Sequence, residues 1–580
     1  MITHEELITR PWYSTYEALN IDEELAPIEE RSAADWVAEH AQKIGDHDAL
    51  VFLGQSISYR QLNDYGNRFA NMLQQLGCKK GDVVGICLPN CPQWAVAVVG
   101  TLKLGCVVSG LSSIMAPPEI IHQVNDADVK VLLTLDQLFN DTVAPIAGEV
   151  PGLKAVVVTA PLDMLPPDEP QVAELLNLIP AVELKPMASV SVLNLKEALQ
   201  GASCDPVATK FAPADTIYIQ YTGGTTGQPK GAQLTLASMA SNALQGQTFN
   251  AYEYGNETMA AAFPFFTLAG LAFLTTGLQM GARYLLIHDP RDLASFCTAM
   301  KMFPPTMLAN VPTLYQMLTD FPAFREVDFS GLRVAISGAA PFPVESIKAL
   351  EAIIGENKLS EVYGMTETSP LLTCNPGERL KVSTVGIPVV GTDIKIICAD
   401  KLDREMPLGE PGEIIARGPQ VMKGYLNLPE ASARALGEFD GYRWFFTGDI
   451  GRMDEEGYIT ICDRSKDMLI VGGFKVFSVE VESKLKELPF IELAALIGTA
   501  DAGRTGSEVV NLYVQLTEKD KGRSHQQFET EIIEFCRVNM TPYKVPRLIH
   551  FIDEMPLTPI GKVDKKSLRQ VPDECAREGE

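Results

Sequence analysis

The chain has few or none of the patterns that mark several common enzyme classes. Its 580 residues include only seven histidines, and none of them lies in a glycine-rich or acidic motif. The sequence contains no G-x-S-x-G, H-E-x-x-H or G-x-G-x-x-G pattern. These absences disfavour triad hydrolases, zinc proteases and simple Rossmann dehydrogenases. Each lone histidine is therefore interpreted as structural or surface-exposed.

Basic residues are also scarce. The chain has 48 lysines and arginines against 74 acidic residues, which gives a formal net charge of -26. A nucleic-acid surface needs clustered Lys and Arg to neutralise phosphates, so nucleic acid is excluded as a partner. Small anions are not excluded, because a local glycine loop with a few cations can bind phosphate in an acidic protein.

The cysteines show no pairing pattern. There are eleven, an odd number, and they are scattered without a C-x-x-C pair or zinc-ligand spacing. The N-terminal "MITHEELITRPW" carries acidic residues where a signal peptide would have basic ones followed by an apolar run. Both features predict a reduced, cytoplasmic protein.

One apolar run, Met259 to Met280, is long enough to span a bilayer. Pro264 interrupts it early, glycine and threonine are frequent in it, and no basic cluster flanks either end. We therefore expect a buried element of an α/β core, with a membrane helix as the alternative. The sequence predicts no transmembrane segment and leaves peripheral membrane contact open.

What is present is an alternation of helix-like and strand-like segments. Residues 58–77, "SYRQLNDYGNRFANMLQQLG", have apolar side chains at helical spacing and end on a glycine. Apolar β-branched runs typical of strands covered on both faces follow. They include "DVVGICL", "VKVLLTL", "LKAVVVTA" and "DTIYIQY". The pattern predicts an α/β fold with several subdomains, because 580 residues are too many for one core.

The chain changes character twice towards its end. A more β-rich stretch contains "TDIKIICAD" and "GEIIARG", and after Asp463 a small α+β unit of about a hundred residues begins, a size that can fold around its own core. We expect a large N-terminal domain of α/β subdomains plus a β-rich subdomain over residues 1–463. A small, mobile α+β domain is expected over residues 464–580.

The stretch "YTGGTTGQPKG", Tyr221 to Gly231, is typical of a loop that holds phosphate. It departs from the Walker pattern, because Lys230 is preceded by Pro229 and followed by Gly231. Glycine amides, threonine hydroxyls and one lysine can still cradle phosphate oxygens. The strand before and the helix-like run after predict a strand–loop–helix frame; a merely flexible turn is the alternative. The candidate nucleotide-binding residues here are Thr222, Gly223, Gly224, Thr225, Thr226, Gly227 and Lys230.

Five further motifs follow in a set order. They are "YGMTET" (Tyr363 to Thr368), "GEIIARGPQVMKGYLNLPE" (Gly412 to Glu430), "WFFTGDIG" (Trp444 to Gly451), "DRSKDML" (Asp463 to Leu469) and "PLTPIGKVDKK" (Pro556 to Lys566). Together with the loop, this series resembles the adenylate-forming superfamily of acyl-CoA synthetases, peptide-synthetase adenylation domains and beetle luciferases. The resemblance covers about residues 30 to 570, and the "YTGG" start is most similar to bacterial fatty-acyl-CoA ligases.

The resemblance implies an ATP site. The Thr222 to Gly231 loop would hold the β and γ phosphates, Thr366 would contact the α-phosphate, and Glu367 would ligate Mg²⁺, which prefers oxygen ligands. In addition, the resemblance assigns Tyr363, with Gly338, Ala339 and Ala340, to the adenine, Asp449 to the ribose hydroxyls and Arg464 to the nucleotide charge. For each residue the alternative is a solvated charge or a capping threonine.

The resemblance also implies two chemical steps. Lys562 would bridge the carboxylate and the α-phosphate during adenylation. The C-terminal domain would then turn about Lys466 and present the "VGGFKVF" loop to coenzyme A. Gly473 would let the backbone pass close to the pantetheine arm, and Lys475 would meet the CoA phosphates, unless it is a surface lysine with no role.

Several positions depart from the family pattern. Leu236 and Thr267 stand where relatives often have histidine. In the "GGFKVFSVE" segment Lys475, Phe477 and Ser478 replace asparagine, tyrosine and proline, which puts the details of thiol recognition in doubt. Lys565 stands where arginine would be common.

The substrate acid is less defined than the reaction. The candidate acyl-pocket residues adjoin the nucleotide motifs, and they are Phe265, Phe266, Thr267, Val311, Gly364 and Met365. Their apolar character favours a medium- or long-chain fatty acid, with a cyclic or aromatic acid as the alternative.

The expected activity is an ATP- and Mg²⁺-dependent acyl-CoA synthetase with CoA as cosubstrate. An acyl-AMP ligase that loads a carrier protein, a catalytically dead binding protein and a membrane transport role are the rivals. A homodimer is left open.

Overall fold

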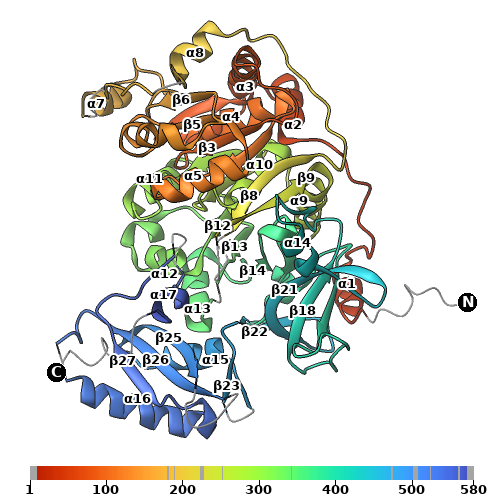
Figure 1. Ribbon diagram of the computed structural model, residues 1–580, viewed down its shortest axis with the longest axis vertical. Coiled ribbons are helices and arrows are strands. Elements are labelled where there is room, and N and C mark those ends of the chain that lie inside the picture. The colour runs from red at the N-terminus through yellow and green to blue at the C-terminus, as the bar shows by residue number, and fades with distance from the viewer. Residues whose placement is uncertain are drawn as a thin grey trace, which may run out of the picture. The chain divides into compact units, whose positions relative to one another are not determined.

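The protein is described by a computed structural model (Figure 1). The described residues are 10–178, 182–187, 190–222, 228–250, 252–340, 342–464, 466–471, 474–500, 507–522, 524–558 and 562–570. Their packing forms two compact units. Unit 1 comprises Met1–Asp393, Arg417–Glu438 and Glu456–Tyr458, and unit 2 comprises Ile394–Ala416, Phe439–Glu455 and Ile459–Glu580. The two units are defined by the contacts within each, which say nothing about which parts move. The predicted boundary of a mobile domain after residue 463 therefore stays a prediction.

One sheet of unit 1 has eight strands, and most of them are parallel. In spatial order they are β19 (Gly424–Tyr425), β9 (Lys230–Thr235), β8 (Thr216–Thr222), β4 (Val107–Gly110), β3 (Val83–Cys87), β5 (Val129–Leu135), β6 (Ala155–Thr159) and β7 (Ser191–Asn194). The four strands expected from apolar runs are β3, β5, β6 and β8. Strands β3 and β6 are buried along their whole length, as their unbroken apolar sequences predict.

The second sheet of unit 1 has nine strands. In spatial order they are β16 (Ile387–Pro388), β15 (Leu371–Cys374), β14 (Leu359–Gly364), β13 (Val334–Ser337), β12 (Met307–Asn310), β10 (Thr258–Ala261), β11 (Arg283–Leu286), β1 (Asp48–Phe52) and β2 (Gln55–Ser58). Its centre, from β14 to β1, is parallel. Parallel strands bring their carboxyl ends to one edge of a sheet, which is where ligands bind in α/β folds.

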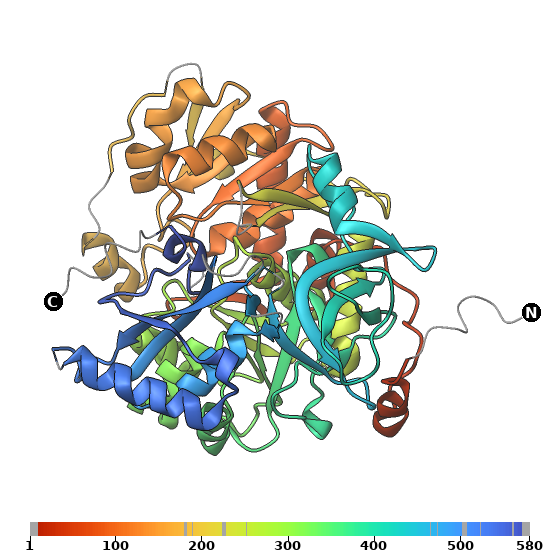
Figure 2. The ribbon, with the colours of Figure 1, turned by 60° about the horizontal axis from the view of Figure 1, so that its bottom comes forward.

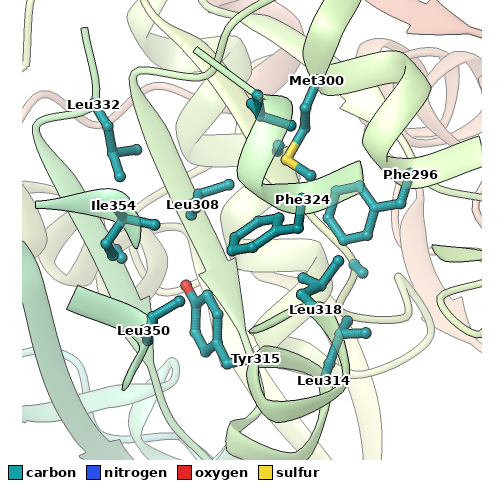
Figure 3. Packing of buried hydrophobic residues seen from close by; sticks show 14 of the residues in the cluster. Phe296, Met300, Leu308, Leu314, Tyr315, Leu318, Phe324, Leu332, Leu350 and Ile354 are labelled. Atoms are coloured by element: carbon teal, nitrogen blue, oxygen red, sulfur yellow. The ribbon is translucent and has the colours of Figure 1, made fainter. Parts of the chain in front are cut away.

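Helices connect these strands, as the α/β alternation predicts. Those of unit 1 are α1 (Tyr13–Leu19), α2 (Ala33–Lys43), α3 (Tyr59–Gln75), α4 (Pro92–Leu104), α5 (Pro117–Asp126), α6 (Asp136–Leu138), α7 (Pro170–Leu178), α8 (Leu195–Gly201), α9 (Leu236–Phe249), α10 (Leu268–Met280), α11 (Leu293–Met302), α12 (Pro312–Asp320) and α13 (Val344–Ile354), together with α14 (Pro429–Ala435). A core cluster joins α11, α12 and α13 to the nine-stranded sheet, and Figure 3 shows Phe296 and Phe324 next to each other within it.

Helix α3 shows how local sequence sets an element's bounds. Ser58 accepts a hydrogen bond from the backbone N–H of Gln61, and the Gln61 side chain accepts one from the backbone N–H of Ser58, so the helix begins with a capping box. Two residues after its end, Gly77 has φ +78°, a left-handed conformation that glycine adopts without strain. The helix predicted for residues 58–77 is confirmed.

The apolar run from Met259 to Met280 contains two elements. Strand β10 occupies its start and the 13-residue helix α10 its end. Among the residues that the structure describes, no helix has both the length and the apolar character needed to cross a membrane. The run is a strand and a helix of the α/β unit, as the sequence predicts.

Unit 2 carries three sheets. A five-stranded sheet contains β17 (Asp393–Ile397), β18 (Gly412–Arg417), β21 (Tyr442–Met453), β20 (Leu436–Phe439) and β22 (Ile459–Arg464). A two-stranded sheet contains β23 (Leu469–Val471) and β24 (Phe474–Val476), and a three-stranded one contains β25 (Ile491–Ala500), β26 (Glu508–Leu516) and β27 (Leu548–Phe551).

The helices of unit 2 are α15 (Ser478–Leu485), α16 (His525–Asn539) and α17 (Lys565–Leu568). Phe528 and Ile532 of α16 lie in one core cluster with the apolar face of β26, and Figure 2 shows the helix running along the strands. These elements form the small α+β unit that the sequence predicts.

Candidate active site

The nucleotide motifs of unit 1 lie at the carboxyl ends of three neighbouring parallel strands. Asn310 of β12 pairs with Ser337 of β13, and Ser337 pairs with Glu361 of β14. Val311 and Gly338 come next in the chain, and Tyr363 follows two residues after Glu361. The structure therefore brings these predicted adenine and acyl residues to one edge of the sheet. Beyond Gly338, Ala339 (φ +71°) and Ala340 are exposed.

The phosphate loop sits in a frame that differs from the predicted one. Strand β8 pairs antiparallel with β9, Thr222 lies opposite Lys230, and α9 begins only after β9. The predicted strand–loop–helix frame is therefore wrong, because the loop closes a β-hairpin. Of the predicted loop residues, Thr222 and Lys230 are described. Gly223, Gly224, Thr225, Thr226 and Gly227 lie outside the described residues.

Tyr425 connects two residues that lie far apart in the sequence. Its hydroxyl donates a 2.7 Å hydrogen bond to Oε1 of Glu367, and the Lys230 ammonium lies 4.9 Å from the centre of its ring. Burial, and then the Glu367 carboxylate, raises the pKa of Tyr425, so the tyrosine is a neutral donor. The sequence analysis missed Tyr425, although it lies within the quoted Gly412–Glu430 motif.

Backbone pairing explains why Tyr425 reaches this place. Strand β19 pairs antiparallel with β9, so that Tyr425 lies opposite Ala232, two residues after Lys230. The backbone N–H of Met422 donates to the carbonyl of Glu367 at 2.9 Å. The Gly412–Glu430 motif is thereby held against both the loop lysine and the carboxylate.

Helix α5 anchors the hairpin from the other side. The Tyr221 hydroxyl donates to Oδ2 of Asp126 at 2.6 Å, and the Asn427 amide donates to the Asp126 backbone carbonyl at 2.9 Å. Nε2 of His122 lies 3.1 Å from the carbonyl of Pro229. These contacts fix both ends of the phosphate loop. His122 has a structural contact here, as expected for a lone histidine.

The "YGMTET" segment needs a glycine at position 364. A Cβ there would overlap the carbonyl oxygen of Pro370, so only glycine fits. Met365 comes next, and Thr366 and Glu367 lie in a short 3₁₀ turn (Thr366–Thr368) in which Glu367 is 9% exposed. The turn directs the Glu367 carboxylate towards Tyr425.

Glu361, the third residue of β14, is a buried carboxyl that was not among the predicted site residues. It is 7% exposed, and its Oε2 has no hydrogen-bond partner. Burial raises its pKa to about 7, against a small opposing effect of the Phe342 backbone N–H. A buried acidic residue beside the adenine motif is a feature that β14's apolar pattern does not reveal.

A second cluster lies within unit 2. Asp449 on β21 is paired with Arg464 on β22, and Oδ1 of Asp449 lies 3.0 Å from Nε of Arg464. Desolvation and then the Arg464 charge lower the pKa of Lys562, whereas the Asp449 carboxylate raises it. The structure thus brings together the three charged residues that the resemblance assigns to the ribose, the nucleotide charge and the transferred group.

Local hydrogen bonds hold two members of this cluster. Asp449, only 4% exposed, donates its backbone N–H to Oγ1 of Thr447 at 3.0 Å. The backbone N–H of Lys562 donates to Oγ1 of Thr558 at 3.1 Å, and the N–H of Thr558 donates back to the carbonyl of Lys562 at 2.6 Å. Two hydrogen bonds therefore hold Lys562 to Thr558.

The residues predicted for the thiol step lie in the same unit. Lys466 is exposed, and its carbonyl accepts a 3.4 Å hydrogen bond from Arg569. Nζ of Lys475 lies 3.1 Å from Oδ1 of Asp400, so this lysine has an acidic partner on the surface. Gly473 lies outside the described residues.

The predicted acyl residues occupy different surroundings. Phe265 is fully buried, with its ring 6.0 Å from that of Trp94. Thr267 caps α10 by accepting a 3.3 Å hydrogen bond from the N–H of Gly270, and Phe266 directly precedes it. Val311 precedes α12 and packs against the core cluster of Figure 3. Capping explains a threonine at 267, where relatives often have histidine.

A narrow cavity of unit 1 lies between α2, α9 and α10. Its volume is about 60 Å³, and Ser369, two residues after Glu367, belongs to its wall. The apolar lining residues are Ala33, Trp36, Ile217, Tyr218, Leu236, Met239, Ala240, Ala243 and Ala272, and the polar ones are Arg31, Ser32, Asn242, Thr275, Thr276, Gln279 and Ser369. None of the six predicted acyl residues lines it.

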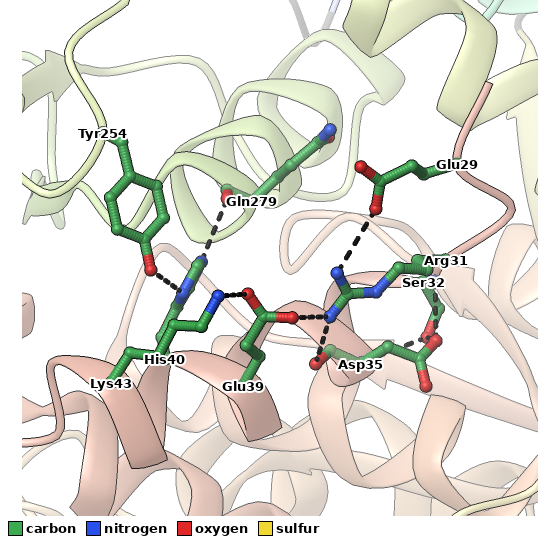
Figure 4. Close-up of polar contacts among 9 residues, drawn as sticks. All are labelled: Glu29, Arg31, Ser32, Asp35, Glu39, His40, Lys43, Tyr254 and Gln279. Carbon is green, nitrogen blue, oxygen red and sulfur yellow. Dashed lines mark hydrogen bonds and ion pairs between the residues drawn. The ribbon is translucent and has the colours of Figure 1, made fainter. Parts of the chain in front are cut away.

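Polar contacts hold the α2 side of this cavity (Figure 4). Arg31 pairs with Glu39 at 2.7 Å and lies 3.8 Å from the ring centre of Trp36. Nε2 of His40 lies 3.0 Å from the carbonyl of Gln279, which ties α2 to α10. His40 thus has the structural role expected for a lone histidine, and burial lowers its pKa.

The predicted magnesium ligand is a single carboxylate, that of Glu367. Among the described residues no group of three or more metal-binding side chains occurs. Mg²⁺ bound with ATP commonly takes one or two protein carboxylates and completes its shell with phosphate oxygens and water. The Glu367 carboxylate, beside Lys230 of the phosphate hairpin, matches that mode.

Comparisons with known proteins agree with this geometry. The family described as "AMP-binding enzyme" matches residues 37–426, and the "AMP-binding enzyme C-terminal domain" matches residues 480–562. A long-chain-fatty-acid–CoA ligase of Escherichia coli O6:H1 is 32% identical over 96% of this chain and 97% of its own length. The ligase of the same name from Bacillus subtilis (strain 168) is also 32% identical, with the same coverage.

Solved structures show the same architecture. The anthranilate CoA ligase AuaEII in complex with anthranoyl-AMP has a TM-score of 0.80 and 25% identity, covering 94% of this chain and 97% of its own. ATP-bound MatB from Rhodopseudomonas palustris has a TM-score of 0.76 and 26% identity, covering 93% and 99%. The chain belongs to the AMP-binding enzyme family. It is an adenylate-forming acid–CoA ligase, an enzyme class that uses ATP and CoA.

Proposed function

We propose that the protein is a long-chain fatty-acyl-CoA synthetase. In the first step the substrate carboxylate attacks the α-phosphorus of ATP, which forms acyl-AMP and releases pyrophosphate. In the second step the CoA thiolate attacks the acyl carbonyl, and AMP leaves. The near full-length match to two ligases named for long-chain fatty acids supports the substrate class.

The first step joins two anions, so the site must supply positive charge where negative charge develops. Within unit 2, Arg464 pairs with Asp449, and the exposed Lys562 lies within electrostatic range of both, so two cations are available to an oxyanion. Asp449 would accept the ribose hydroxyls. This three-residue cluster is the observation that carries the proposed reaction.

Unit 1 would hold the rest of the nucleotide. Lys230 and the Thr222–Gly231 hairpin would hold the β and γ phosphates, Thr366 the α-phosphate, and Tyr363 the adenine. Glu367, oriented by the Tyr425 hydroxyl, would ligate Mg²⁺, which offsets the phosphate charge when it is bound.

For the second step we propose that residues 464–580 turn about Lys466 as a mobile domain, with residues 1–463 as the other body. The turn would carry Lys562 away and bring Gly473 and Lys475 to CoA. Lys475 would then exchange its surface contact with Asp400 for CoA phosphates; exposed pairs of this kind are weak enough to exchange.

The ten described cysteines are free thiols, which fits the proposed cytoplasmic location.

The acyl chain has two candidate locations. The six predicted residues around Phe265 and Gly364 adjoin the nucleotide motifs. The cavity beside Ser369, two residues from Glu367, has both apolar and polar lining residues. We propose that its apolar side chains, Ile217, Leu236 and Met239 among them, contact part of the acyl chain.

An aromatic acid is the second candidate substrate. A feruloyl-CoA synthase of an Amycolatopsis species is 29% identical over 92% of this chain, and the anthranilate ligase has a similar structure. The polar residues of the cavity lining would suit a substituted ring. An acyl-AMP ligase that passes its product to a carrier protein is the alternative in the second step.

One experiment tests the reaction, the substrate and the acceptor. Saturated acids of increasing chain length, ferulate and anthranilate are each offered with ATP and Mg²⁺, and acyl-AMP and acyl-CoA are quantified with and without CoA. We expect acyl-CoA from long-chain acids at a kcat/KM well above that of the aromatic acids. A preference for the aromatic acids contradicts the substrate, and acyl-AMP without acyl-CoA for every acid contradicts the acceptor.

A further inference from the structure

Asp463, immediately before the predicted hinge segment, is the centre of a buried polar network. The residue is 1% exposed and ends β22 together with Arg464. Its carboxylate accepts a hydrogen bond from the backbone N–H of Ser478 and a second, 3.0 Å long, from the Ser478 hydroxyl. A proline at position 478 would supply neither donor. Ser478 itself is fully buried as the first residue of α15.

Lys565 extends the network to the segment that carries Lys562. Its ammonium donates to Oγ of Ser478 at 2.6 Å and pairs with Glu482 at 2.7 Å. Oε1 of Glu482 also accepts a 2.7 Å hydrogen bond from the backbone N–H of Leu496 on β25. Each buried charge thus has a partner, which offsets the free-energy cost of burying it.

Asp463 precedes Lys466 in the chain, and its carboxylate accepts from the neighbouring backbone N–H of Arg464 and from Ser478, which follows Lys466. Arg569, one residue after α17, pairs with Asp467 at 2.6 Å, so α17 is bound to the segment after the hinge. Helix α15, β25 and α17 are therefore linked to one another, and two hydrogen bonds from Ser478 connect them to Asp463.

We propose that Ser478, supported by Lys565, is a latch on Asp463 that holds the enzyme in the conformation that forms acyl-AMP. This inference rests on the proposed domain rotation about Lys466. In the latched state Lys562, three residues before Lys565, lies within electrostatic range of Arg464 and Asp449. Rotation about Lys466 breaks the two Ser478 hydrogen bonds, so the latch sets the balance between the two half-reactions. Ser478 and Lys565 are positioning residues that touch no substrate.

The latch predicts opposite sensitivities of the two half-reactions. Ser478→Ala removes the hydroxyl but keeps the backbone N–H and the fold of α15. A hydrogen bond to a charged group is worth enough to change a conformational equilibrium roughly tenfold. We expect the rate of acyl-AMP formation to fall and the rate of acyl-CoA formation from supplied acyl-AMP to stay or rise, so that their ratio changes roughly tenfold.

The matched control is Ser524→Ala. Ser524 directly precedes α16 of unit 2, a position similar to that of Ser478 at the start of α15. In contrast to Ser478, it is exposed, and its side chain makes no capping hydrogen bond. This variant is expected to keep both rates. Equal loss of both rates in Ser478→Ala, or no change relative to the control, overturns the latch.

A double variant separates the latch from general damage. If the hydroxyl acts through Asp463, Asp463→Asn combined with Ser478→Ala is expected to change the ratio no more than the larger single variant. Additive changes overturn the pairing. Failure of the wild-type enzyme to form acyl-AMP from any acid refutes the proposed function, whereas an active wild type with an unaffected Ser478→Ala refutes only the latch.

Discussion

Replacing Glu361 with glutamine is expected to change how the stability of the protein depends on pH. Burial raises the pKa of this carboxyl from 4.5 to about 7 in the folded state. In the unfolded chain the group titrates near its ordinary value. Between these two values the folded protein therefore holds a proton that the unfolded chain has released, and stability falls as the pH rises.

The magnitude follows from that interval. At about 1.4 kcal/mol per pH unit, the span from 4.5 to about 7 corresponds to a loss of about 3 kcal/mol that is complete above pH 7. Glutamine has a similar shape and stays neutral, so Glu361→Gln avoids this loss. For a unit of this size we expect its Tm to lie roughly 3–4 °C above that of the wild type at pH 8, with the increment shrinking towards pH 4.5.

The assay is thermal unfolding at a series of pH values from 4.5 to 8.5, followed by calorimetry and by intrinsic fluorescence. The control is Glu378→Gln, the same chemical change at an exposed position of the same unit. We expect the control to track the wild type at every pH. A Tm difference for Glu361→Gln that is constant with pH, or that grows towards acid pH, refutes the reasoning.

Three further outcomes test the site. Lys562→Ala is expected to lower acyl-AMP formation by roughly 10²- to 10³-fold while leaving acyl-CoA formation from supplied acyl-AMP intact; equal loss in both assays argues against the hinge. Tyr425→Phe removes the hydrogen bond that orients Glu367, and the Mg²⁺ concentration for half-maximal adenylation should rise roughly tenfold, whereas an unchanged Mg²⁺ dependence argues against the metal assignment. Gly364→Ala forces a Cβ onto the Pro370 carbonyl and should destabilise unit 1 by about 1–3 kcal/mol, measured by thermal unfolding; unaltered stability contradicts the packing.

Much of the fold was predictable because its signals are local. The apolar spacing of residues 58–77 and the glycine at 77 predicted α3, and the structure adds a capping box at Ser58. The unbroken apolar runs that became β3 and β6 identify strands covered on both faces. Such signals depend on neighbouring residues, so they can be read without knowing what packs against them.

The class of reaction could also be predicted from the sequence, for a different reason. The order of six motifs identified an adenylate-forming ligase, and the comparisons confirm the family. The frame of the phosphate loop was predicted wrongly, because strand β9 pairs with β8 and separates the loop from the predicted helix, which forms as α9. Pairing of that kind is decided by the partner strand and not by the segment's own composition.

What the sequence by itself determined is the enzyme family and the class of reaction, through six motifs in a set order, whereas the roles of single residues stay predictions. Only the tertiary structure decided how these residues meet: Tyr425 between Lys230 and Glu367, Glu361 buried beside the adenine motif, and Ser478 on Asp463. These contacts join segments 15 to 195 positions apart. The physical reason is that hydrogen bonding and burial depend on three-dimensional neighbours, which strand pairing and helix packing select.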